Sequence, residues 1–133
     1  MRLAYCFFIV AVIAAIIGMS LGIYMGIVHD HTLAPVHAHV NLLGWASMFL
    51  YGLYYRGEPT AAATPLAKAH FGLAAIGLVA MNGALAPMLY GDERFLPVAI
   101  VGSLASLAAM LTFLAVVLRR AFAARPAARP ARA

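Results

Sequence analysis

The stretch PVHAHVNLLGWASMFLYGLYY, residues 35–55, decides the fold of this chain. It is mostly apolar and compatible with a helix, and at about 1.5 Å per residue it is long enough to cross the roughly 30 Å hydrocarbon core of a bilayer. Pro35 suits a first helical turn, because its missing N–H is not needed there. His37 and His39 lie in the first turns of this predicted helix.

The composition indicates that a lipid bilayer surrounds most of the chain. Its 133 residues predict one domain, and 65% of them are hydrophobic while only 10% are charged. Ordinary soluble domains are about 45–50% apolar. The formal net charge of +5 comes mainly from arginines in a C-terminal tail, which suggests contact with anionic lipid; nucleic acid is not a predicted partner. Cys6 is the one cysteine, so covalent c-type heme attachment is excluded.

The pattern of apolar runs and breaks predicts an all-α membrane protein with four transmembrane helices. The expected helices cover about residues 3–28, 35–55, 66–90 and 95–118, within a domain of residues 1–120. Residues 121–133 contain mostly Ala, Arg and Pro, a composition that cannot bury a core. We therefore expect a disordered basic tail.

The basic residues predict how the helices are oriented in the membrane. If four helices alternate, one side receives Arg2, Arg56, Lys68, Arg119, Arg120, Arg125, Arg129 and Arg132, and the other receives Arg94 alone. Basic residues accumulate on the cytoplasmic side of membrane proteins. We therefore expect both termini in the cytoplasm of a bacterial cell, with the protein crossing the inner membrane several times.

Four of the five histidines fall within eleven positions: His29, His31, His37 and His39. Ionisable groups at membrane depth are costly and often functional, and neutral imidazole is a common ligand of heme iron, copper and zinc. Solvation in the lipid headgroup region is the simpler explanation for a single histidine, but it explains four less well. His70 lies near the inner surface, roughly 20 Å from His39, so the two cannot share a metal in one chain.

The spacing of His37 and His39 predicts two separate pockets. Residues two apart on a helix are about 200° apart, so the two rings point to opposite sides and cannot chelate one ion. Asn41 can orient an imidazole, and Trp45 can line a pocket. Packing and interfacial anchoring explain these two residues equally well.

The segment of residues 22–55, GIYMGIVHDHTLAPVHAHVNLLGWASMFLYGLYY, resembles the histidine-bearing part of the heme-copper oxidase subunit I superfamily. The likeness is closest in HAHVNLLGW and extends to short stand-alone proteins described as cytochrome c oxidase subunit I-like. In the large family, twelve helices form three arcs of four, and one helix carries an H-x-H whose histidines serve two hemes. This chain has one such helix, no histidine pair on its third helix and no HxxxY sequence, which excludes a proton-pumping oxidase in one chain.

The resemblance implies a homo-oligomer, with a trimer favoured, in which heme b lies between subunits and takes His37 from one and His39 from the next. It also gives Arg94 a role in meeting the heme carboxylates, although an ion pair with Asp92 or Glu93 explains that arginine equally well. We therefore expect a b-type membrane cytochrome that transfers electrons or binds O2 or NO, with copper as a possible companion of the heme.

Two alternatives stay open. One is a membrane protein that handles or senses copper or zinc, using His29, His31, His37 and His39 as ligands. A purely structural role is the other. The sequence identifies neither the redox partner nor any catalytic residue, so whether the protein is an enzyme is left open.

Overall fold

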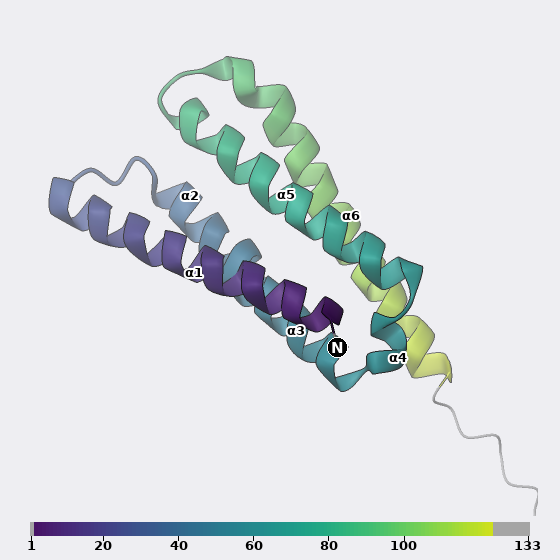
Figure 1. The fold of residues 1–133 in the computed structure, drawn as a ribbon. Helices are drawn as coiled ribbons and strands as arrows, with labels where there is room; N and C mark the ends of the chain where they lie inside the picture. Colours follow the sequence, from purple (N-terminus) through teal and green to yellow (C-terminus); the bar gives the residue numbers. More distant parts are fainter. Residues whose placement is uncertain (1, 124–133) are drawn as a thin grey trace, which may run out of the picture.

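The computed structural model describes residues 2–123, and this part of the chain is helical with no strand (Figure 1). Its elements are α1 (Arg2–Val28), α2 (Ala34–His39), the π-helical segment η1 (Val40–Ser47), α3 (Met48–Gly57), α4 (Pro59–Ala62), α5 (Pro65–Leu89), the 3-10 turn η2 (Glu93–Phe95) and α6 (Leu96–Ala123). The chain forms two helical pairs: α1 packs against the α2–η1–α3 run, and α5 packs against α6. The all-α prediction is confirmed.

The second predicted helix differs from the regular α-helix that the sequence suggested. Its middle turns are widened, and the Ser47 hydroxyl donates a 2.8 Å hydrogen bond to the carbonyl of Leu42, five residues earlier. A wider turn lengthens the repeat of the buried positions. The buried residues accordingly recur every fourth position, at Val36, Val40, Gly44 and Met48. One continuous face of the α2–η1–α3 segment is therefore buried in the protein interior.

Two other boundaries differ from the predicted ones. The stretch between the second and third predicted helices contains the short helix α4, which Pro59 begins. This helix ends before Thr64, whose extended backbone is the conformation favoured before Pro65. Helix α6 continues to Ala123, three residues into the predicted tail, because Ala and Arg favour helix and no proline intervenes. The remaining predicted tail, 124–133, lies outside the described residues.

Within residues 2–123, three helices are long and apolar enough to cross a membrane: α1, α5 and the stretch Glu93–Ala123 that contains α6. Large apolar side chains cover their outer surfaces, including Ile27 at 73% exposure and Val79 at 72%. Small residues fill much of the interior, among them Ala4, Ala11 and Ala67. This arrangement suits a multi-pass membrane protein, in which small residues let helices approach and lipid covers the large side chains.

The charged side chains lie at the two ends of the bundle. Near α4, the Arg120 guanidinium contacts the Glu58 carboxylate at 2.8 Å and ties α6 to the α3–α4 turn. The start of α1 lies at this same end, whereas the turns that follow α1 and α5 lie at the opposite end (Figure 1). The hydrophobic spans therefore separate two polar ends.

Close backbone contact joins α5 to α6 at Gly102. A Cβ atom at this position would overlap the backbone of Met81 and lie 3.0 Å from the carbonyl carbon of Ala80. Backbone atoms cannot rotate away as a flexible side chain can. A glycine at 102 thus lets the two helices pack at this distance.

We expect Gly102→Ala to destabilise the protein by about 1–3 kcal/mol, because the added methyl group must push the helices apart. Gly72→Ala on α5 is the matched control, since a Cβ there meets nothing within 4 Å. Thermal unfolding in detergent, followed by circular dichroism, measures both changes. Equal melting temperatures for the two variants would contradict the packing described here.

Candidate functional site

His37 lies in the contact between α2 and α1. Its Nδ1 atom is 2.9 Å from the carbonyl oxygen of Gly18 on α1, and the ring is partly buried. Because a carbonyl only accepts, Nδ1 carries the proton in this hydrogen bond. The proton-free nitrogen of the neutral ring is therefore Nε2.

Two glycines of α1 make room for this arrangement. A Cβ atom at Gly22 would lie 2.9 Å from Cε1 of His37, and one at Gly18 would lie 2.6 Å from the Asn41 amide. Gly26 lies four residues after Gly22 on α1, and a Cβ atom there would meet nothing within 4 Å. Gly18 and Gly22 therefore receive His37 and Asn41, while Gly26 has no comparable contact.

His39 is held within its own helix rather than against α1. Its Nδ1 atom is 2.7 Å from the carbonyl oxygen of Pro35, and its ring is partly exposed. Because the Pro35 carbonyl only accepts, Nδ1 of His39 donates to it, and Nε2 keeps its lone pair. His37 and His39 thus use different helices as their partners.

Both rings share one feature that matters for ligand binding. A hydrogen bond from Nδ1 to a backbone carbonyl fixes the tautomer and the orientation of an imidazole. Metal-ligating histidines commonly have such a partner. Each ring is therefore prepared to offer Nε2 to an iron or copper ion.

Asn41 and Trp45, the two predicted neighbours of the histidines, occupy different environments. The Asn41 amide donates to the His37 carbonyl oxygen at 2.8 Å and lies 3.4 Å from Nε2 of the same residue. The second distance is at the long end of the hydrogen-bond range, so Nε2 is only weakly engaged. Trp45 is 50% exposed on the outer surface of η1. Asn41 therefore supports His37, whereas Trp45 faces outward.

The outer histidines His29 and His31 lie in the exposed turn after α1. Asp30 between them accepts two hydrogen bonds from Thr32, one from its amide at 2.9 Å and one from its hydroxyl at 2.7 Å. These hydrogen bonds lower the pKa of the Asp30 carboxyl. Within residues 2–123, no group of three His, Cys, Asp or Glu side chains is placed to hold a metal ion. The four predicted histidines therefore do not form one metal cluster in a single chain.

Arg94 pairs with Asp92, one of the two partners that the sequence suggested. Its Nε atom donates to one carboxylate oxygen and its terminal nitrogen to the other, both at 2.8 Å. The guanidinium lowers the pKa of the Asp92 carboxyl. The arginine is 88% exposed, so solvent weakens this pair. Arg94 lies at the same end of the bundle as the turn before His37.

The outward face of the α2–η1–α3 run is apolar. Leu42 is 64% exposed and Leu50 is 63% exposed. The opposite face, which carries Met48, Tyr51 and Tyr55, is buried. The buried face of the run is therefore more polar and aromatic than its outward face.

His70 is a buried residue to which the sequence gave no role. Its ring is fully buried, and Nδ1 lies 3.0 Å from the Tyr55 hydroxyl. Within residues 2–123, its Nε2 atom has no hydrogen-bond partner. The rings that contact it come from three other elements, α1, α3 and α6: Phe7, Tyr51, Tyr55 and Phe113. No local pattern links these residues, so only the fold reveals the cluster.

We expect Gly22→Ala to displace the His37 ring and weaken its hydrogen bond to Gly18, because the new methyl group overlaps Cε1. Gly26→Ala is the control, since it meets open space. The 15N chemical shifts of a histidine ring report its tautomer and hydrogen bonding. The first variant should change the His37 signals and the second should not; unchanged signals in Gly22→Ala would contradict the observed contact.

Comparison of the chain with protein-family models, with curated proteins and with solved structures found no match.

Proposed function

We propose that this protein is a b-type heme-binding membrane protein, related to the heme-copper oxidase subunit I superfamily, that transfers electrons or binds O2 or NO. His37 and His39 have the same hydrogen-bonding pattern, and this observation carries the proposal. Each donates Nδ1–H to a backbone carbonyl, at 2.9 and 2.7 Å respectively, which leaves the lone pair on Nε2. At His37 the Asn41 amide, 3.4 Å from Nε2, would have to give way to a ligand. Bound heme would supply one-electron chemistry at its iron.

The positions of the two histidines favour heme shared between subunits. His37 is seated against α1, whereas His39 is partly exposed beside outward-facing leucines. His37 of one copy and His39 of the next would hold the heme, and the apolar outer face would cover the porphyrin. In a closed ring every contact repeats, so each subunit supplies both histidines and each interface holds one heme. A homotrimer would rebuild twelve helices.

Copper or zinc handling has weaker support. Asp30 is engaged by Thr32, and His37 and His39 have separate partners. A metal ion without a porphyrin needs several protein ligands close together. An axial heme ligand needs only one nitrogen per side, which each of these histidines can provide.

We further propose that the α2–η1–α3 run is a fourth membrane crossing. The helical segments cover residues 34–57 without interruption, and at about 1.5 Å per residue this run is comparable to the thickness of the hydrocarbon core. Four crossings place the start of α1 and the end of α6 on the same side. The basic residues make that side cytoplasmic in a bacterial inner membrane, and the histidine pair then lies in the outer half of the bilayer.

The heme proposal predicts that the purified protein is red, has a Soret band and contains one heme per chain. His37→Ala and His39→Ala should each remove the low-spin heme spectrum, because each deletes one axial nitrogen of every shared heme. Pyridine-hemochrome analysis and absorption spectra of the detergent-solubilised variants measure this.

His31→Ala and His70→Ala are the controls, because one ring lies in the exposed turn and the other lies in the aromatic cluster at the opposite end of the bundle. Both should retain heme at the wild-type ratio. Full retention of heme by both ligand variants would overturn the assignment. Colourless wild-type protein with one bound copper or zinc ion per chain would favour the alternative.

The fourth crossing predicts which loops are accessible from outside the cell. In a Cys6→Ser background, Glu93→Cys, at an exposed position of the turn after α5, should react with a membrane-impermeant maleimide applied to intact cells after permeabilisation of the outer membrane. Ala63→Cys, in the turn after α4, should react only after the inner membrane is disrupted. If both positions react from the same side, the α2–η1–α3 run does not span the bilayer.

A further inference from the structure

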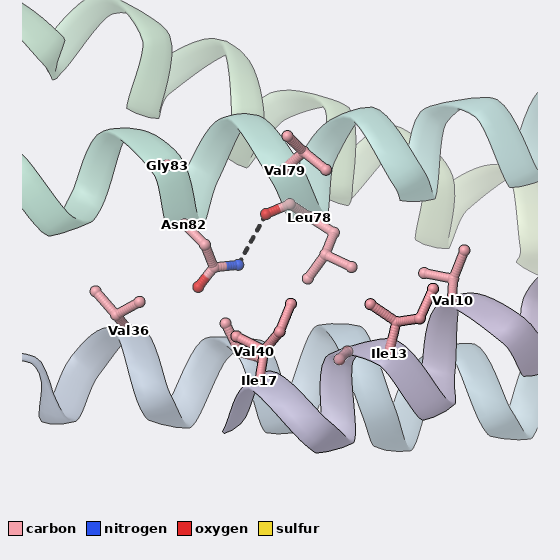
Figure 2. A pocket seen from close by; sticks show the side chains of 10 residues that line it. Val10, Ile13, Ile17, Val36, Val40, Leu78, Val79, Asn82 and Gly83 are labelled. Carbon is pink, nitrogen blue, oxygen red and sulfur yellow. Dashed lines mark hydrogen bonds between the residues drawn. The ribbon is translucent and has the colours of Figure 1, made fainter. Parts of the chain in front are cut away.

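A groove of about 460 Å³ lies between the two helical pairs (Figure 2). Apolar side chains of α1, α2, η1 and α5 line it, with Val36 and Val40 buried and Ile13, Ile17 and Val79 more than half exposed. The exposed side chains lie on surfaces that lipid would cover, so the groove opens sideways toward the bilayer. Its volume is within the range of about 300–1,000 Å³ that small-molecule sites have.

One polar side chain points into this apolar space. Asn82 on α5 is only 8% exposed, and its amide nitrogen donates a 2.8 Å hydrogen bond to the Leu78 carbonyl. That bond fixes the direction of the amide, so the oxygen Oδ1 faces the groove, as Figure 2 shows. Oδ1 is buried and has no hydrogen-bond partner in the part of the chain that the structure describes. The groove therefore contains one oriented acceptor that lacks a donor.

The surroundings define the donor that fits. Hydrocarbon chains of lipids carry no donors, and an ordered water needs two to four polar partners, whereas Asn82 is the one polar side chain in the lining. No ionisable side chain lines the groove, so a charged headgroup would remain unpaired there. Asn82 is seven residues before the end of α5 at Leu89, which places it roughly 10 Å below that end.

We propose that this groove binds an uncharged lipid whose hydroxyl group donates a hydrogen bond to Oδ1 of Asn82. The apolar body of the lipid lies along Val36, Val40 and the exposed isoleucines of α1. A hydroxyl at this depth pairs with the amide below the headgroup layer, so a molecule with one hydroxyl on an apolar body fits better than a phospholipid. The site does not use His37 or His39 and is independent of heme binding.

A pair of photoreactive probes tests this proposal: a diazirine-bearing sixteen-carbon alcohol and its methyl ether, which has no donor. Each is added to the full-length protein in detergent, and mass spectrometry locates the crosslinks. In the wild type, the alcohol should label residues 36–40 and 79–83 about three- to tenfold more than the ether does, the effect of one neutral hydrogen bond.

Two variants distinguish the contribution of the hydrogen bond from that of the open space in the groove. Asn82→Leu removes the acceptor and should reduce labelling by the alcohol to the level of the ether. Gly83→Leu should reduce labelling by both probes alike, because the added side chain enters the groove where a Cβ meets nothing within 4 Å. Ser103→Ala on the exposed surface of α6 is the control and should leave both values unchanged.

Competition identifies the source of the hydroxyl. Unlabelled hexadecanol or an unlabelled quinol that displaces the alcohol probe supports the site and shows whether it accepts aliphatic or ring hydroxyls. Equal labelling of the wild type by alcohol and ether would overturn the proposal and indicate an ordinary acyl chain in the groove. A preference for the alcohol that persists in Asn82→Leu would also overturn the proposal. So would the absence of labelling by both probes, which would indicate that a second copy covers the groove.

Discussion

The packing of α2 against α1 depends on the hydrogen bond between the His37 ring on α2 and the Gly18 carbonyl on α1. The carbonyls of Gly18 and its neighbours already accept bonds within the helix, so a side chain reaches one only where the helix surface is bare. Glycines at 18 and 22 create that bare surface. The bond then fixes the rotation of α2, which directs Val36 and Val40 inward and leaves His39 outside. One polar contact thus links the position of the His37 ring to the lining of the groove.

Two buried polar atoms lack partners in the described residues, and their surroundings differ. Nε2 of His70 is enclosed by aromatic rings at the α4 end, where the Tyr55 hydroxyl holds the other ring nitrogen. Oδ1 of Asn82 faces an apolar groove that is open to the bilayer. The groove beside Oδ1 is the reason that we propose a ligand at Asn82, whereas the aromatic rings around Nε2 of His70 give no reason to propose one there.

Much of the architecture was predictable from hydrophobicity and helix-breaking residues. Long apolar runs bounded by turns gave the positions of α1, α5 and α6 to within a few residues, except at the end of α6. The pattern could not predict the widened turns of η1, because it assumes 3.6 residues per turn, and only the packing of Val36, Val40, Gly44 and Met48 shows the four-residue repeat. Sequence spacing did place His37 and His39 on different sides of one helix.

The sequence by itself determined that the chain is helical, largely apolar and polar only at its two ends, since these properties follow from composition and local periodicity. It also singled out the histidines, because ionisable residues are rare in such a chain. Only the tertiary structure decided which nitrogen each histidine offers, that Arg94 contacts Asp92, and that Asn82 faces a groove. Those outcomes depend on atoms brought together from distant segments or turned by their neighbours, and spacing along one helix carries no information about them.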